Sequence, residues 1–351
     1  MAGPRRRIIP VFIPNDGCEH DCVFCDQRVI SGRGSPAGPD DVRKAYSLEL
    51  SVESGEWSVE CDGLSAQPAE LAFYGGSFTA IPVERQNELL EAARPFLEMN
   101  PQNSIRVSTR PDCIDEKTVE RLKSYGVATV ELGAQSMSHD VLVQSRRGHT
   151  AEDVARASGI IKGAGLSLML QMMTGLLGDT REKSLFTARR FTELSPDGVR
   201  VYPTVIVKGT ELFNMWRRGE YSEHSLDEAV ELCAEICAVF ERAGVPVIRL
   251  GLNPSDALSA GDAVAGAYHP AFGELVYSRI YYNKAAALIS GLMPCGEVTI
   301  TVSKGSASKM AGQRRQNIRM LEQRFALRNI KIAESDLCPG EITVEKKPVR
   351  S

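Results

Sequence analysis

Short apolar segments alternate with amphipathic stretches along most of the chain. The apolar segments lie at 8–13, 69–74, 104–108, 127–133, 166–173 and 198–203, and another spans Val245 to Leu250. Stretches with helical spacing of apolar residues lie between them, at about 41–54, 83–98, 115–125, 150–163, 181–194 and 225–243. Several apolar segments, such as VIRL and LSLMLQMM, are nearly continuous, which is typical of parallel strands covered on both faces.

These repeated strand–helix units predict a parallel sheet with right-handed crossovers. Six or seven units fit an open or partial barrel better than a closed barrel of eight strands. We therefore expect an α/β fold in which residues 1–250 form a partial (β/α)6-type TIM barrel. In such barrels the chemistry lies on the loops that follow the carboxyl ends of the strands.

The pattern changes from about Gly251 onward. The stretch GLNPSDALSAGDAVAGAYHP is rich in loop-forming residues and predicts a long loop that crosses the barrel mouth. A helix near 275–290, a strand near 297–303, a helix near 306–326 and short strands are expected after it. Residues 251–351 are thus predicted to hold this loop and a small α+β extension.

Glycines and polar residues gather at one end of the predicted strands. The second to sixth strands are followed or ended by YGGSFT at 74–79, STRPD at 108–112, ELGAQS at 131–136, QMMTGL at 171–176 and YPT at 202–204. A barrel with a purely structural role does not require polar groups at one end of every strand. A functional site is therefore expected at this end.

Composition and charge narrow the class of protein. The 351 residues carry a net charge of −4, so the chain as a whole has no general attraction for nucleic acid or membranes. Nine unevenly spaced cysteines and the lack of a recognisable secretion signal indicate a reducing compartment. No apolar run approaches the roughly 18 residues that a membrane helix needs. We expect a cytoplasmic protein without a membrane segment.

One region departs from this acidic balance. Residues 279–331 hold ten lysines and arginines against two acidic residues. Most charge runs are solvated helix faces, but a local excess of this size creates a positive field in which phosphates can bind. The residues predicted to contact nucleic acid are Lys304, Lys309, Arg314, Arg315 and Arg319.

The run CEHDCVFC, directly after the first predicted strand, places Cys18, Cys22 and Cys25 within eight residues. Thiolates favour iron–sulfur clusters or zinc. Zinc bound by these cysteines and His20 is one interpretation, although zinc usually takes ligands from two separated pairs and no second such pair is present. A four-iron cluster held by three cysteines instead leaves one iron without a protein ligand, where a reactant can bind.

The C-x3-C-x2-C spacing, with Phe24 before the last cysteine and Gly75-Gly76 one strand–helix unit later, resembles the radical S-adenosylmethionine (SAM) enzymes. The resemblance implies that Cys18, Cys22 and Cys25 hold a 4Fe-4S cluster whose open iron binds S-adenosyl-L-methionine. It also implies that one-electron reduction cleaves SAM to a 5′-deoxyadenosyl radical. A reducing protein such as a flavodoxin or ferredoxin would be the electron-donating partner.

Further motifs narrow this resemblance. GGSF, STRPD, VELGAQS, RRGHT, QMMTGLLGDT and PDGVRVYPTVIVKGTELFNMW-x-x-GEY follow the cysteines in order, from about Ile8 to about Ile248. Together they resemble the radical SAM domain of the Elongator catalytic subunit, which implies modification of wobble uridines in tRNA. About 100 residues remain after this region, without a recognisable acyl-CoA loop, so we expect a form that lacks the acetyltransferase domain.

The resemblance also assigns site residues. Glycines let the backbone approach the methionine amino group of SAM, and the two glutamines match contacts to its ribose. The predicted cofactor-binding residues are Gly75, Gly76, Ser77, Thr79, Arg110, Glu131, Gln135 and Gln171. Glu131 has a second interpretation as a structural ion pair, because a carboxylate at a buried strand end needs a partner such as Arg110 or Arg106.

The catalytic residues are less defined, and the candidates are Tyr202, Lys208 and His269. Two other functions stay open at this point. One is a radical SAM enzyme that acts on a small molecule or tetrapyrrole, and the other is a non-catalytic iron–sulfur protein that binds RNA or a partner.

Overall fold

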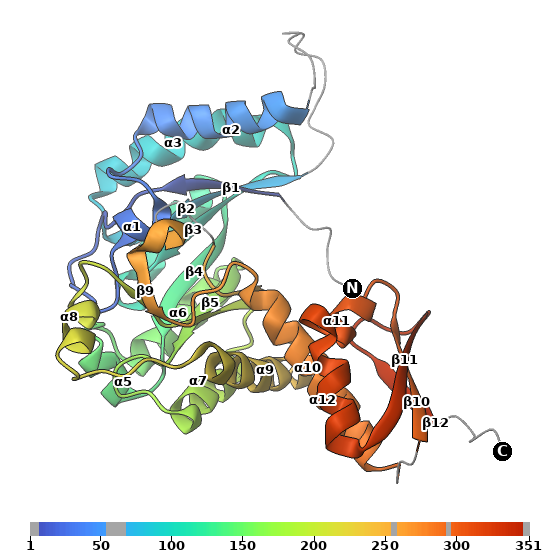
Figure 1. The fold of residues 1–351 in the computed structure, drawn as a ribbon. Coiled ribbons are helices and arrows are strands. Elements are labelled where there is room, and N and C mark those ends of the chain that lie inside the picture. The colour runs from blue at the N-terminus through green and yellow to red at the C-terminus, as the bar shows by residue number, and fades with distance from the viewer. Residues whose placement is uncertain (1–6, 54–67, 254–257, 293–295, 347–351) are drawn as a thin grey trace. The chain divides into compact units, whose positions relative to one another are not determined.

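The computed structural model describes residues 7–53, 68–253, 258–292 and 296–346 (Figure 1). These residues form two compact units. The first comprises residues 1–224 and 239–267, and the second comprises residues 225–238 and 268–351. The predicted domain boundary at residue 250 stays a prediction.

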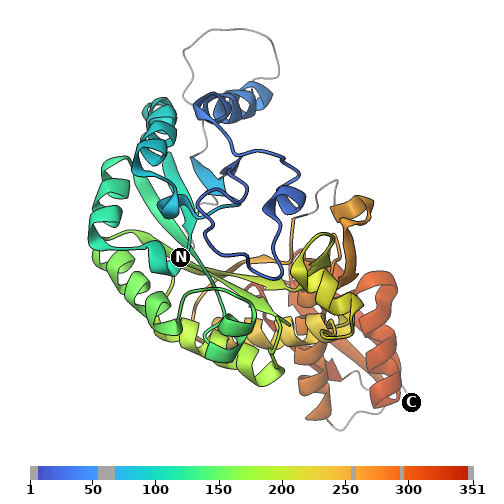
Figure 2. The same ribbon diagram turned by 90° about the vertical axis from the view of Figure 1, so that its left-hand side faces the viewer.

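The first unit is built on a seven-stranded sheet in the order β1-β2-β3-β4-β5-β6-β8. Its strands are β1 (Arg7–Phe12), β2 (Ala69–Tyr74), β3 (Ser104–Thr109), β4 (Val127–Gln135), β5 (Ser167–Thr174), β6 (Gly198–Pro203) and β8 (Val247–Leu250). Every neighbouring pair is parallel. The sheet curls into a half-barrel with helices along its outer face (Figure 2), so the predicted partial TIM barrel is confirmed.

The long helices begin and end within two residues of the predicted ranges. They are α2 (Pro39–Glu53), α3 (Val83–Met99), α4 (Glu116–Ser124), α6 (Ala151–Gly163), α7 (Arg181–Glu193) and α9 (Leu226–Arg242). Polar residues fix several helix starts. Asp115 accepts a hydrogen bond from the Thr118 amide, and Thr150 forms a capping box with Asp153.

The core of the first unit lies between the sheet and the outer helices. The strand residues Leu71, Phe73 and Val107 are fully buried, as are Leu89 and Leu90 of α3. Burying the apolar strand residues against helices is the main stabilising contribution in such a fold. The carboxyl ends of the strands stay free of this packing and carry the site.

Several short elements lie at that end and were not predicted. They are α1 (Gln27–Ser31), the 3-10 turns η1 (Phe78–Ala80) and η2 (Pro111–Cys113), α5 (His139–Gln144), β7 (Val205–Val207), α8 (Glu211–Arg217), the π-helical turn η3 (Leu258–Asp262) and β9 (Ala263–Gly266). Strands β7 and β9 pair antiparallel, and we call this pair the β7–β9 ribbon.

The ribbon corrects the prediction of one long loop at 251–272. Residues 258–266 form a π-helical turn and a strand, because their main chain hydrogen-bonds to β7 and their apolar residues Val264 and Ala265 pack inward. The turn η3 contacts α1, the helix that follows the cysteine loop. Residues 254–257 of the predicted loop lie outside the described residues.

The second unit is a small α+β unit, as predicted. Its elements are α10 (Phe272–Ser290), β10 (Gly296–Ser303), α11 (Ala307–Ala311), the 3-10 turn η4 (Gln313–Arg315), α12 (Gln316–Phe325), β11 (Leu327–Ser335) and β12 (Ile342–Lys346). Strand β10 pairs parallel with β11 and antiparallel with β12. Its apolar core includes Ile289, Ile300, Met310 and Leu321.

The prediction of a single helix at 306–326 is wrong. Gly312, Arg314 and Arg315 have φ angles of 72°, 48° and 60°, which interrupt the helix between α11 and α12. The buried Asn317 fixes this break, since its side-chain amide donates to the carbonyl oxygens of Ser278 at 2.9 Å and Met310 at 3.1 Å.

Across the described residues, no helix combines the length and the apolar character that crossing a membrane requires.

Candidate functional site

The loop that carries the cysteines is held against the glycine loop after β2 by main-chain hydrogen bonds. The Asn15 amide donates to the Gly75 carbonyl at 2.8 Å, and the Ser77 amide donates to the Asp16 carbonyl at 2.8 Å. The two loops follow neighbouring parallel strands, so their meeting is a consequence of the sheet order. The structure therefore brings together the two motifs that the sequence had separated by about 50 residues.

Two glycines allow this close approach. A Cβ atom on Gly76 would lie 2.4 Å from the Asp16 carbonyl oxygen and 2.5 Å from that of Ile13, and a Cβ atom on Gly17 would lie 2.3 Å from the Ser77 carbonyl oxygen. No real Cβ atom tolerates such distances to backbone, so both positions require glycine. Packing of the two loops is thus one reason for Gly76, and the predicted contact of the glycine pair with SAM stays a prediction.

Gly76→Ala is therefore expected to displace the cysteine loop and to lower the free energy of unfolding by about 1–3 kcal/mol, the usual cost of overpacking. We expect the protein to retain much less iron after anaerobic reconstitution, measured by iron analysis and visible absorption. Gly34→Ala is the matched control, because a Cβ atom on Gly34 meets nothing within 4 Å. Equal iron content in the two variants would contradict this account of the loop contact.

The three thiols influence one another and lie in a partly buried environment. Burial, together with the charge of Cys22, raises the pKa of Cys25 to about 12, and the same two causes raise the pKa of Cys18. Two side chains donate to the sulfurs: Gln27 Nε2 to Cys25 Sγ at 3.2 Å, and Arg147 Nη1 to Cys22 Sγ at 3.0 Å. The thiols are therefore close together and surrounded by hydrogen-bond donors.

Zinc and an iron–sulfur cluster require different arrangements of these groups. Among the described residues, no three His, Cys, Asp or Glu side chains converge closely enough to hold one metal ion. In a four-iron cluster each cysteine binds a different iron, so the sulfurs surround a volume and do not have to meet at one point. His20, the fourth ligand of the zinc interpretation, packs instead on Gly148, where an added Cβ atom would lie 2.4 Å from its Nε2.

Arg147 is a site residue that the sequence analysis did not single out. It is only 7 % exposed, it donates to the Gly133 carbonyl at 2.5 Å as well as to Cys22, and its guanidinium lies 5.9 Å from the centre of the Phe24 ring. A buried cation beside thiolates offsets their negative charge. The available signal was the second arginine of RRGHT, since a loop glycine follows it at position 148.

An apolar cluster covers one side of the cysteine loop. Val23 and Phe24 pack with Ile206 of β7 and Leu212 of α8, and the partly buried members include Cys22, Cys25, Leu177, Trp216, Val264 and Ala265. The loop is also tied down through its backbone, because the Val23 carbonyl accepts from the Leu212 amide at 2.6 Å. The β7–β9 ribbon and α8 thus shield the cysteines from water on this side.

The loops after β2 and β3 are joined by hydroxyl groups. Thr109 Oγ1 lies 3.0 Å from Ser77 Oγ and 2.6 Å from Thr79 Oγ1. The Arg110 amide donates to Ser77 Oγ at 3.3 Å, while its guanidinium pairs with Asp112 at 2.9 Å. The structure therefore brings Ser77, Thr79 and Arg110 together beside the cysteine loop, and their contact with SAM stays a prediction.

The two predicted ribose ligands also meet. Gln171 Nε2 donates to Gln135 Oε1 at 3.3 Å. Gln135 has a φ of 65°, an uncommon backbone conformation for a residue other than glycine, and strain of this kind is concentrated at functional sites. The two side chains therefore lie together in the half-barrel, and their contact with SAM stays a prediction.

Glu131 lies in a buried ion-pair network inside the half-barrel. It is 1 % exposed, and its carboxylate is 3.4 Å from Arg106 Nη1 and 3.0 Å from Arg200 Nε. Arg106 also pairs with Glu70 at 2.6 Å. The sequence analysis named Arg106 and Arg110 as possible partners of Glu131. Arg106 is a partner, whereas Arg110 pairs with Asp112. These contacts satisfy the carboxylate internally, and a cofactor contact of Glu131 stays a prediction.

The three catalytic candidates lie in different places. Tyr202 is in the half-barrel, where its hydroxyl accepts from Arg200 Nη1 at 3.2 Å and burial raises its pKa. Lys208 is exposed directly after β7 and pairs with Asp262 at 3.6 Å. His269 belongs to the second unit, where its Nδ1 accepts a main-chain hydrogen bond at the start of α10. Their catalytic roles stay predictions.

Two sequence families match the chain. The Radical SAM superfamily matches residues 12–190, and the Radical_SAM C-terminal domain matches residues 196–282. The first match covers the cysteine loop, the glycine loop and every predicted cofactor-binding residue. The second covers the β7–β9 ribbon and α8.

The curated relatives include tRNA uridine(34) acetyltransferases and Elongator complex proteins. The chain is 27 % identical over 324 residues to the tRNA uridine(34) acetyltransferase of Methanocaldococcus infernus, covering 83 % of this chain and 59 % of that protein. It is 35 % identical over 252 residues to the protein of that name from Dehalococcoides mccartyi, covering 63 % and 54 %. Human Elongator complex protein 3 is 28 % identical over 257 residues, covering 62 % and 45 %. The chain thus spans about half the length of these relatives.

A solved structure shares the fold. The archaeal Elp3 of Methanocaldococcus infernus, with residues 1–46 deleted, matches with a TM-score of 0.61 and 23 % identity, over 79 % of this chain and 63 % of that chain. At this identity the match concerns the fold alone, and it agrees with the half-barrel described above.

Proposed function

The chain belongs to the radical SAM superfamily, and from that premise we propose that it is an enzyme that binds a 4Fe-4S cluster and SAM and modifies a base of tRNA. The observation that carries this proposal is the seating of Cys18, Cys22 and Cys25 against the glycine loop, with Arg147 donating to one sulfur. The reducing conditions that such a cluster needs fit the nine cysteines and a cytoplasmic location.

The roles of the protein side chains follow from their positions. The three cysteines would ligate the cluster, and Arg147 and Gln27 would stabilise the ligating sulfurs by hydrogen bonds. A cluster with one open iron, together with SAM and one electron from a flavodoxin or ferredoxin, supplies a 5′-deoxyadenosyl radical. The apolar cluster around Val23 and Phe24 would keep water away from this chemistry.

The assignment of tRNA as substrate rests on two kinds of support. The relatives named above are tRNA uridine(34) acetyltransferases and Elongator proteins. Their greater length means that acetyl transfer is not carried over, and our proposal is restricted to radical chemistry on the tRNA base. The second kind of support is a basic surface on the second unit.

This basic surface has arginines available for phosphates. Arg314, Arg315 and Arg319 are exposed, and Arg319 Nη1 donates to the Arg314 carbonyl oxygen at 2.5 Å. Lys304 pairs with the exposed Asp336 at 2.7 Å, and Lys309 lies 5.2 Å from the centre of the Tyr277 ring. Exposed cations beside one another attract an external polyanion.

Replacing Arg314, Arg315 and Arg319 together by alanine is expected to weaken tRNA binding and to reduce the slope of log affinity against log salt by about 2. Each phosphate contact that is lost means that fewer counterions are released from the RNA on binding. Fluorescence anisotropy at several salt concentrations measures both. The matched control replaces three exposed arginines that pair with acids, namely Arg43, Arg94 and Arg156. An equal effect of both triple variants would contradict this surface as the anchor.

The proposed activity is tested directly by anaerobic reconstitution with iron and sulfide, followed by dithionite and SAM. Formation of 5′-deoxyadenosine is expected, and its absence from a fully loaded protein would contradict the enzyme. Comparing the modified nucleosides of tRNA from cells with and without the gene then identifies the product. Unchanged nucleosides alongside active SAM cleavage would favour a small-molecule or tetrapyrrole substrate over RNA.

A further inference from the structure

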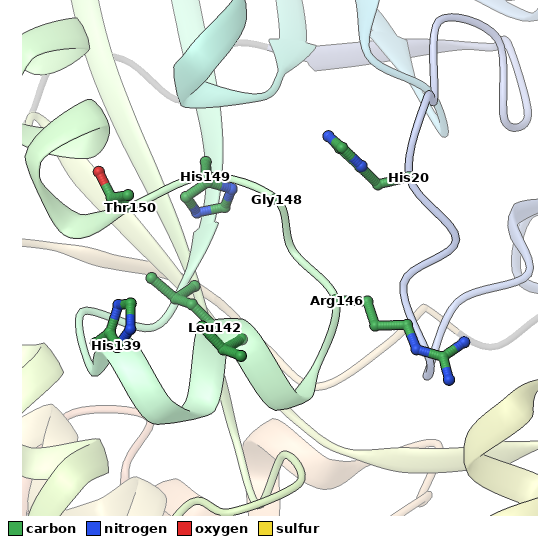
Figure 3. Close-up of a pocket in the computed structure, with 8 residues that line it drawn as sticks. His20, His139, Leu142, Arg146, Gly148, His149 and Thr150 are labelled. Atoms are coloured by element: carbon green, nitrogen blue, oxygen red, sulfur yellow. The ribbon is translucent and has the colours of Figure 1, made fainter.

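The cysteine loop borders a pocket that offers a ligand few groups to bind. His20 lines this pocket together with His139, Leu142 and His149 (Figure 3). Leu142 and His149 are only 2 % and 4 % exposed, and His149 Nδ1 is buried. The inside of the half-barrel differs from this pocket, because its polar side chains keep accessible surface.

The inner face of the half-barrel is accessible between its strands' buried residues. Successive residues of a strand point to opposite faces of the sheet. Along β5 every second residue is buried, and the residues between them are half-buried. On β6 the half-buried residues are Arg200 and Tyr202. Because the helices cover the outer face (Figure 2), the half-buried residues are those of the inner face, where a ligand can contact them.

Arg200 joins two tyrosines across the inside of the half-barrel. Its Nη2 donates to the Tyr74 hydroxyl at 2.6 Å, and its Nη1 donates to the Tyr202 hydroxyl at 3.2 Å. The guanidinium also lies 5.1 Å from the centre of the Tyr74 ring. Tyr74 ends β2 and Tyr202 lies on β6, and three strands separate β2 from β6 in the sheet. The contact therefore spans the curl of the half-barrel.

These contacts fix the role of both phenols. A guanidinium has no acceptor, so each phenol oxygen accepts from Arg200 and keeps its own O–H proton to donate. Neither hydroxyl donates to an acceptor among the described residues. Burial raises the pKa of Tyr74 and of Tyr202, so both phenols stay protonated at pH 7. The half-barrel thus holds two O–H donors on one rigid guanidinium fork.

The two phenols are held in place close to the proposed radical chemistry. Arg200 Nε lies 3.0 Å from the Glu131 carboxylate, and this ion pair restrains the guanidinium. Tyr74 directly precedes Gly75 of the glycine loop, against which the cysteine loop is seated. In the sheet register Arg200 is opposite Gln171, one of the predicted ribose ligands. A group bound by the two phenols would therefore lie beside SAM.

We propose that Tyr74 and Tyr202 bind the substrate base by donating hydrogen bonds to its carbonyl oxygens, with Arg200 as the residue that positions both hydroxyls. Two such donors select a base whose edge carries acceptor oxygens, and they select against adenine, which has no carbonyl oxygen. This inference rests on the proposed function, since it takes a tRNA base as the substrate, and it adds the residues that recognise that base.

The test uses an anticodon stem–loop RNA in which single carbonyl oxygens of the target base, identified by the nucleoside comparison, are replaced by sulfur. Sulfur is a weak hydrogen-bond acceptor. The reconstituted wild-type protein is expected to bind the unsubstituted RNA about fivefold more tightly in fluorescence anisotropy, the factor that one neutral hydrogen bond contributes. Tyr74→Phe and Tyr202→Phe are each expected to lose the preference for the oxygen that the missing hydroxyl contacts.

Tyr46→Phe is the matched control, because Tyr46 is buried on α2, where its ring packs on Phe96. It is expected to keep the wild-type preference. Thermal melting and circular dichroism establish which variants are folded, and if only one of the two test variants folds, its result decides.

Two outcomes would overturn the proposal. One is an unchanged oxygen preference in a folded test variant, including a variant that binds both RNAs more weakly by the same factor, as a purely structural role predicts. The other is adenine as the target base. Failure of the proposed function is distinguishable from both, because the wild-type protein would then bind no RNA or form no 5′-deoxyadenosine.

Discussion

A Cys22→Ala protein is expected to emerge from anaerobic reconstitution without the visible absorption and the electron paramagnetic resonance signal of a four-iron cluster. Its formation of 5′-deoxyadenosine is expected to fall to the level of the apoprotein. Cys22 is chosen because it touches Arg147 and influences the pKa of both other thiols. Removing one of three ligands leaves two irons without a protein ligand.

Cys338→Ala is the matched control, because Cys338 is an exposed free cysteine in the second unit. It is expected to load iron and to cleave SAM like the wild-type protein. A Cys22→Ala protein that keeps its cluster and its activity would refute the assignment of the cysteine loop. Loss of both properties in both variants would instead indicate that any cysteine substitution harms the protein.

The second large effect concerns stability. Arg106→Met is expected to lower the free energy of unfolding by about 3–5 kcal/mol, since it leaves the buried Glu70 without its cation and leaves Glu131 with Arg200 alone. Chemical denaturation followed by circular dichroism measures the change. Adding Glu70→Gln is expected to restore part of the loss, because it removes the buried charge that has lost its cation.

Arg94→Ala provides the comparison for this prediction. Arg94 pairs with Glu91 one helical turn away on α3, and both side chains are at least half exposed. Exposed pairs contribute about 0–1 kcal/mol, so this variant is expected to be nearly as stable as the wild-type protein. A similar small loss in Arg106→Met would show that the buried network has little influence on folding.

The sequence predicted most of the barrel because its strands and helices have strong local signals. Strands β2 and β6 match their predicted ranges at both ends, and α3 differs by one residue. The elements that were missed are short. The ribbon strand β9 has four residues, AVAG, whose extended conformation depends on pairing with β7, some 60 residues earlier. A strand that depends on such a tertiary contact does not need an alternating apolar and polar pattern in its own sequence.

The helix predicted over 306–326 failed for a related reason. Its residues favour a helix, and Gly312 was the one local sign of a break. The left-handed conformation of Arg314 and Arg315 is held by Asn317, which hydrogen-bonds to Ser278 on α10. A side chain whose partner is about 40 residues away cannot be recognised from local composition.

The site was predictable where residue type and spacing carry the chemistry, as in the cysteines and the glycine pair. It was not predictable where a residue acts through burial. In the sequence, Arg147 is one of two adjacent arginines and resembles a surface residue. Only the fold places it against Cys22.

The ribbon has a consequence for biosynthesis. The cysteine loop is translated before the Val264 and Ala265 side chains that cover it, which follow it by about 240 residues. During that interval the nascent thiols face the cell without their apolar cover. The thiols are therefore more open to oxidants and to other metals before the ribbon has been translated than after it.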